Sequence, residues 1–115
     1  MKIRDILSEK KPTVSFEIFP PNKRMSLGQV MAASAAMSVQ RPDFMSVTYG
    51  AAGGTKENTV KIASSLQEFL GIPSIAHLTC VATEKEQVKA IALEMKAAGI
   101  ENVLALRGDI QEDVA

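Results

Sequence analysis

Short β-like segments recur along this chain about every 30 residues, and a helical pattern fills each interval between them. The four segments are residues 13–19, 44–49, 74–80 and 102–107. A strand, a helix and a second strand form a βαβ unit, whose right-handed crossover produces a parallel sheet. The recurrence therefore predicts an α/β fold in which four parallel strands alternate with helices.

Helices are expected over residues 2–9, 27–40, 58–70 and 84–98. In the last two helices, apolar side chains recur at helical spacing and form one face. In the helix over 58–70 this face consists of Val60, Ile62, Ala63, Leu66, Phe69 and Leu70. In the helix over 84–98 it consists of Val88, Ile91, Ala92 and Met95. Gly71 and Gly99 follow these patterns and are the expected stop residues. Thr83 and Glu86 have the spacing of a capping box at the start of the last helix.

Two architectures are compatible with this alternation of strands and helices: an open doubly wound sheet and a (β/α)8 TIM barrel. Strands of an open sheet are buried on both faces and read as continuous apolar runs. Here apolar and polar side chains alternate along each strand. In order along the chain, the opposed sets are Val14, Phe16 and Ile18 against Ser15 and Glu17, Met45 and Val47 against Ser46 and Thr48, Ala76, Leu78 and Cys80 against His77 and Thr79, and Leu104 and Leu106 against Ala105 and Arg107. We expect helices to cover the first face and the second to line the interior of a barrel that opens at the C-terminal ends of its strands. The alternation favours the barrel.

The length of the chain limits how much of a barrel it can form. A full TIM barrel needs about 250 residues, whereas this chain has 115. Residues 1–115 are therefore expected to be the N-terminal part of a single barrel domain, with four strands and three intervening helices. A truncation, a proteolytic remnant and a half-barrel that assembles with another copy all fit this length.

Composition argues against several classes of function. Lys and Arg number 13 against 13 Asp and Glu, so the basic excess of a nucleic-acid-binding protein is missing. The apolar runs are far shorter than the roughly 18 residues that a membrane span requires. Cys80 is the single cysteine and no Cys/His cluster has zinc spacing, so we expect neither an internal disulfide nor a metal site. We expect a cytoplasmic protein.

Glu17 is the first candidate for chemistry. It lies between Phe16 and Phe19, ahead of a Pro-Pro turn, where we expect its carboxyl group to be poorly hydrated. Desolvation disfavours the charged form of a carboxyl group and suits it to general-acid chemistry near neutral pH. The alternative is a solvated glutamate at a strand end.

Further polar residues end the other three strands. Thr48 opens the small-residue loop 48–54, which is either a ligand-approach loop or a simple turn. His77, the only histidine, is either a hydrogen-bonded core residue or a catalytic one. Arg107 offers a donor fork for phosphate or carboxylate and Asp109 an acceptor, unless the two form a surface ion pair. Parallel strands would bring all of them to the same end of the sheet.

Four ordered motifs carry a family resemblance: Phe16-Glu17-Ile18-Phe19-Pro20-Pro21, Val47-Thr48-Tyr49-Gly50, His77-Leu78-Thr79-Cys80 and Ala105-Leu106-Arg107-Gly108-Asp109. In order and spacing they resemble the motifs of methylenetetrahydrofolate reductases, across nearly the whole chain. The resemblance implies a TIM barrel that binds FAD at its C-terminal face. It also implies an oxidoreductase of one-carbon metabolism, in which NADH or NADPH reduces FAD and 5,10-methylenetetrahydrofolate then becomes 5-methyltetrahydrofolate.

The resemblance also implies roles for individual residues. Glu17 matches the general acid that protonates the folate amine, and Asp109 matches a catalytic carboxylate beside flavin and folate. The residues that match positions of the family's FAD site are Thr48, His77, Leu106, Arg107, Gly108 and Asp109. Two alternatives remain for the chain: a non-catalytic half-barrel that self-associates, and a flavin-free, pterin-dependent methyltransferase barrel. We expect a homo-oligomer, because half a barrel leaves two sheet edges unpaired.

Overall fold

The computed structural model describes residues 1–9, 12–49, 56–81 and 83–108. Helices and strands alternate in the order α1 (Ile3–Glu9), β1 (Ser15–Ile18), α2 (Leu27–Ser38), β2 (Phe44–Val47), α3 (Lys56–Phe69), β3 (Ser74–Thr79), α4 (Lys85–Ala97) and β4 (Val103–Leu106). Every predicted element is present, and each end lies within two residues of its predicted position.

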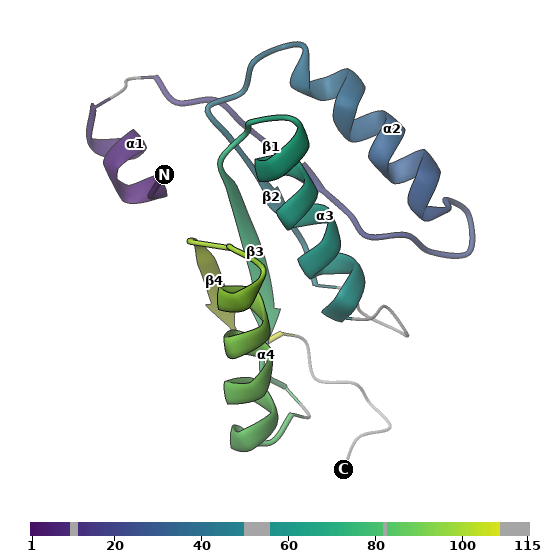
Figure 1. Cartoon of the computed structure of the whole chain (residues 1–115), viewed down its shortest axis with the longest axis vertical. Coiled ribbons are helices and arrows are strands. Elements are labelled where there is room, and N and C mark those ends of the chain that lie inside the picture. The colour runs from purple at the N-terminus through teal and green to yellow at the C-terminus, as the bar shows by residue number, and fades with distance from the viewer. Residues whose placement is uncertain (10–11, 50–55, 82, 109–115) are drawn as a thin grey trace.

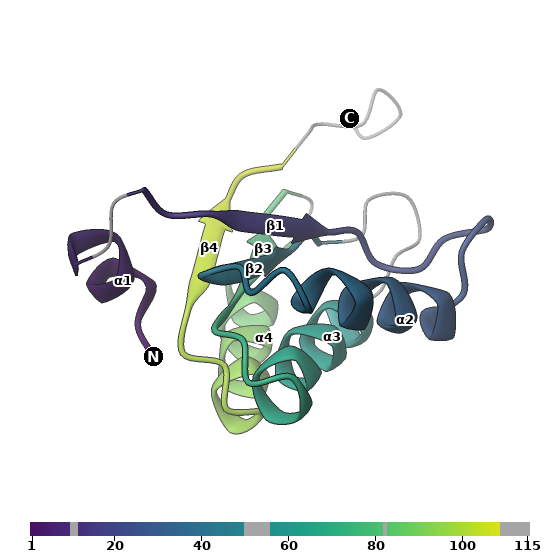
Figure 2. The same ribbon diagram turned by 90° about the horizontal axis from the view of Figure 1, so that it is seen from above.

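The strands form one parallel sheet in the order β1-β2-β3-β4, so β1 and β4 are its edges, as predicted. Figure 1 shows α3 lying across the middle of this sheet, and Figure 2 shows α2, α3 and α4 on the same side of it. A doubly wound sheet carries helices on both faces and does not place its strands in simple sequential order. The helix-covered side is called the helix face below, and the opposite side the open face.

The core lies between the sheet and α3. Met45 and Val47 from β2 and Ile62 and Leu66 from α3 are all 0% exposed, which confirms the predicted inward faces of both elements. Phe69 of α3 is an exception, because its side chain is 76% exposed, and so is Val14, which was predicted to lie under the helices and is 51% exposed.

The position of Ser74 explains why Phe69 is exposed. The hydroxyl of Ser74, the first residue of β3, lies 2.9 Å from the Ala63 carbonyl oxygen and 3.1 Å from Gln67 Oε1. The sheet thus begins level with residues 63–67, and Phe69 projects beyond it. In α4, Ile91 and Met95 are buried as predicted, but Ala92 is exposed.

The faces of β4 differ from the prediction. His77 pairs with Leu104 and Thr79 pairs with Leu106, so both leucines lie on the open face. The assignment of Leu104 and Leu106 to the helix face was therefore wrong, and so was that of Ala105 to the interior face, because Ala105 pairs with Leu78. The segment 103–106 is apolar at every position, so alternation cannot distinguish its faces, and the register with β3 decides which residues point to the helices.

Both predicted stop glycines adopt the left-handed conformation that ends a helix, with φ of 65° at Gly71 and 82° at Gly99. The predicted capping box is displaced by one residue. Helix α4 is capped by Glu84, whose backbone N–H donates to Gln87 Oε1 at 3.0 Å. Thr83 does not cap the helix, and its hydroxyl donates to the Val81 carbonyl at 3.2 Å.

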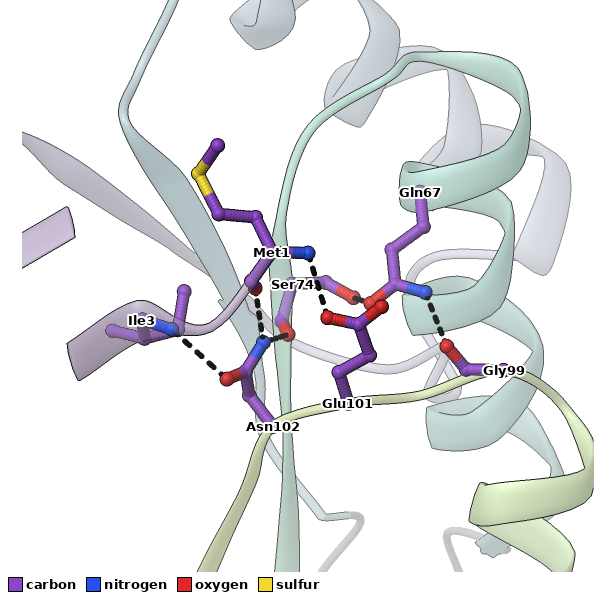
Figure 3. A network of polar contacts seen from close by, with 7 residues as sticks. All are labelled: Met1, Ile3, Gln67, Ser74, Gly99, Glu101 and Asn102. Carbon is purple, nitrogen blue, oxygen red and sulfur yellow. Dashed lines mark hydrogen bonds and ion pairs between the residues drawn. The ribbon is translucent and has the colours of Figure 1, made fainter. Parts of the chain in front are cut away.

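A polar network joins α1 to the sheet at the end where the strands begin (Figure 3). The side chain of Asn102 is its centre: Oδ1 accepts from the Ile3 N–H at 3.0 Å, and Nδ2 donates to the carbonyls of Met1 at 3.0 Å and Ser74 at 3.2 Å. One amide group thus connects the first turn of the chain with the starts of β3 and β4. Beside it, the Met1 amino group lies 2.7 Å from Glu101 Oε2 and lowers the pKa of that carboxyl by its hydrogen bond and its charge.

Candidate functional site

Glu17 and His77 approach each other on the open face, across β2. The Glu17 Oε1 atom lies 3.6 Å from His77 Nε2, although β1 and β3 are not neighbours in the sheet. Ser46 of β2 lies between the two strands, and its hydroxyl donates to the same Oε1 at 3.3 Å. A carboxyl group, an imidazole and a hydroxyl thus converge near the C-terminal ends of three consecutive strands. This is where parallel α/β folds carry their functional groups.

The predicted apolar enclosure of Glu17 is not present in the described part of the chain. The side chain of Glu17 is 50% exposed, and that of His77 only 12%. Neighbouring residues of a strand point to opposite faces, so Phe16 packs against the core on the helix face and cannot cover Glu17. Phe19 follows the strand and is 66% exposed. The prediction of a poorly hydrated Glu17 was wrong because it assumed that residues adjacent in sequence also pack together.

Thr48 directly follows β2 beside this group and is held through its backbone. Its N–H donates to the Ile18 carbonyl at 3.0 Å, and its carbonyl accepts from the Thr59 hydroxyl at 3.0 Å. Thr59 lies on α3 and is 0% exposed. A buried hydroxyl of the crossover helix therefore fixes the point where the chain leaves β2, a contact that no pattern in the sequence predicted.

The end of β4 lies against the end of β3. Gly108 has a φ of 84°, and a Cβ atom at this position would lie 3.1 Å from both Thr79 Cβ and Val81 Cγ1. The glycine therefore allows a close approach of two chain segments. The neighbouring Arg107 is exposed, and its Nε donates to the Gly108 carbonyl at 3.1 Å. Its guanidinium stays on the same end of the sheet as Glu17 and His77.

Two other sequence candidates, Asp109 and the loop residues 50–54, lie outside the described residues. Within the described ranges, no group of three or more His, Cys, Asp or Glu side chains has the arrangement of a metal site. None of the helices in those ranges is long and apolar enough to cross a membrane.

A parallel sheet with polar side chains gathered at the C-terminal ends of its strands is typical of α/β enzymes. A family model described as methylenetetrahydrofolate reductase matches residues 2–115. The 5,10-methylenetetrahydrofolate reductase of Pectobacterium carotovorum subsp. carotovorum is 36% identical over 100 residues, which cover 87% of this chain and 34% of that protein. Methylenetetrahydrofolate reductase 2 of Schizosaccharomyces pombe is 39% identical over 114 residues, covering 95% and 18% of the two proteins.

The chain belongs to the methylenetetrahydrofolate reductase family. The resemblance stated from its four motifs is thereby confirmed. The chain spans about a third of the length of the bacterial relative and 18% of that of the yeast relative.

Proposed function

We propose that the full-length protein is an FAD-dependent oxidoreductase that reduces 5,10-methylenetetrahydrofolate to 5-methyltetrahydrofolate with NADH or NADPH. The observation that carries this proposal is the family match over residues 2–115. The structure agrees with it, because the carboxyl group of Glu17 lies beside His77 at the C-terminal ends of the strands. We place the enzyme in the cytoplasm, and the single cysteine of these 115 residues is in keeping with a reducing compartment.

We further propose that residues 1–115 form the first half of a TIM barrel. The sequential strand order supports this architecture, and so does the location of α2, α3 and α4 on one side of the sheet. In such a barrel the open face would become the interior wall, and the side chains of Glu17 and His77 would line the mouth of the barrel.

The residues proposed to hold FAD supply suitable chemistry. Thr48 offers a hydroxyl, His77 an imidazole and Arg107 an exposed guanidinium, which can donate to phosphate or to ring atoms. Leu106 pairs with Thr79 on the open face and would give an apolar contact, while Gly108 keeps the ends of β3 and β4 close together. Asp109 follows directly and is the proposed second catalytic carboxylate.

In the proposed reaction, FAD when bound supplies the hydride chemistry, and the chain supplies the proton and the geometry. Glu17 donates its proton to the folate amine nitrogen as the carbon–nitrogen bond of the five-membered ring breaks. The bonding electron pair stays with that nitrogen, and a cationic iminium remains on the folate. Glu17 leaves the step as a carboxylate, and Asp109 opposes the positive charge of the iminium.

The flavin content of the purified full-length protein tests the proposed function. We expect the absorbance of bound FAD, its bleaching by NADH or NADPH, and its return when methylenetetrahydrofolate is added. A flavin-free pterin-dependent methyltransferase would contain no such chromophore, and a non-catalytic protein would not respond to folate. Absence of flavin from a folded full-length protein, with no binding on titration, would refute the proposal.

Asp109→Asn in the full-length protein should weaken folate binding and slow folate reduction, because the neutral amide no longer opposes the cationic intermediate. The midpoint of thermal unfolding should stay unchanged, since the substitution preserves the shape of the side chain. Stopped-flow measurement of flavin reoxidation against folate concentration separates binding from rate. An unchanged affinity and rate would reduce Asp109 to a surface partner of Arg107.

A further inference from the structure

Among the described residues, two side chains contact Glu17, and both approach the same carboxyl oxygen. The Ser46 hydroxyl donates to Oε1 at 3.3 Å, and His77 Nε2 lies 3.6 Å from Oε1. Neither contact engages Oε2. The two oxygens of a carboxyl group are chemically equivalent until its surroundings distinguish them, and here the surroundings do so.

The position of Ser46 in the sheet explains how this contact arises. Glu17 pairs directly with Ser46, so the two side chains project side by side on the open face. Ser46 in turn pairs with Ile75, and His77 lies two residues further along β3. The Glu17 carboxyl group therefore passes over β2 and leans toward the C-terminal end of the sheet.

The size of residue 46 is part of this arrangement. Adjacent strands lie about 4.8 Å apart, so β1 and β3 are separated by about twice that distance. A short side chain at position 46 leaves room for the Glu17 carboxyl group to cross β2 toward His77. Serine is short, and it also carries a single O–H donor that can be directed at the passing carboxyl group.

Resting on the proposed role of Glu17 as the general acid, we propose that Ser46 is a positioning residue for that acid. Its hydroxyl keeps Oε1 as a hydrogen-bond acceptor, and His77 Nε2 lies near the same oxygen, so that the transferable proton resides on Oε2. The proton is then presented by one defined oxygen, and the carboxyl group is held against rotation. In this proposal the Ser46 hydroxyl contacts neither Oε2, the oxygen that donates the proton, nor the folate.

Ser46→Ala in the full-length enzyme tests this inference. We expect folate reduction to slow about tenfold, the scale expected for one hydrogen bond to an ionisable group. Folate affinity and flavin reduction by NADH or NADPH should not change, because neither depends on the orientation of the acid. Ser46→Thr keeps the hydroxyl and should recover most of the rate. Ser15→Ala, a matched change on the same face of β1, should leave the rate unaltered.

A double-mutant cycle separates positioning from a general structural effect. In a Glu17→Gln background, Ser46→Ala should cause no further loss, because the acid on which it acts is already gone. Equal losses in both backgrounds would overturn the positioning role, as would a normal rate in Ser46→Ala. If Glu17→Gln alone leaves folate reduction intact, the proposed function of Glu17 fails instead, and the two failures are thus distinguished.

Discussion

Folate reduction in a full-length Glu17→Gln enzyme is expected to fall by about 100-fold or more, the scale of losing a general acid. Glutamine preserves the size of the side chain and its ability to accept from Ser46, but its amide cannot donate a proton to the leaving amine. Flavin reduction by NADH or NADPH requires no proton from this carboxyl group, so that half-reaction should keep its rate. Stopped-flow absorbance of the flavin follows the two half-reactions separately.

The control for this substitution is Glu68→Gln, which makes the same chemical change on an exposed position of α3. Both half-reactions should proceed normally in the control. A Glu17→Gln enzyme that reduces folate at nearly the normal rate would remove Glu17 from its proposed role. Loss of both half-reactions together would point to a damaged flavin site.

The 115-residue chain alone should self-associate, bind FAD weakly or not at all, and show no folate reduction. Its sheet has unpaired edges at β1 and β4, and such edges pair readily with other chains. One of the two leucines on the open face of β4, Leu104, is 48% exposed, and Val103 on the opposite face is 44% exposed. Exposed apolar patches beyond a few hundred Å² favour association, and a two-fold dimer is the simplest product.

Analytical ultracentrifugation with a parallel FAD titration measures both parts of this prediction. Leu104→Lys should shift the association toward monomer if the open face takes part. Leu93→Lys makes the same change at a 58% exposed position of α4 and serves as its control. A well-folded monomer that holds one FAD per chain would contradict the prediction and show that the first half alone builds the site.

Periodicity predicted the secondary structure well, because each segment carries a local signal of its own. The alternation in β2 and β3 identified Met45, Val47, Ala76 and Leu78 as residues of the helix face. It failed at Leu104, in a strand that is apolar at every position, because only the register with β3 distinguishes the two faces. It also failed at Phe69, where the helix continues past the start of the sheet.

The candidate site was predicted in its location but not in its contacts. Strand polarity and parallel order were enough to bring Glu17 and His77 to one end of the sheet. The approach of their side chains across β2, and the hydroxyl of Ser46 beneath them, depend on strand register, which the sequence does not encode locally. The contact of the buried Thr59 hydroxyl was not predicted for the same reason, because its partner, the Thr48 carbonyl, lies outside α3.

The amide of Asn102 has a consequence for the order in which the chain acquires its structure during translation. Its contact with the Ile3 N–H joins residues separated by 99 positions. Ribosomes add about 5–20 residues per second, so α1 emerges several seconds before its anchor exists. A seven-residue helix is not stable in water by itself. Residues 3–9 therefore remain undocked until Asn102 has been synthesised, and α1 settles later than the helices that follow it in this sequence.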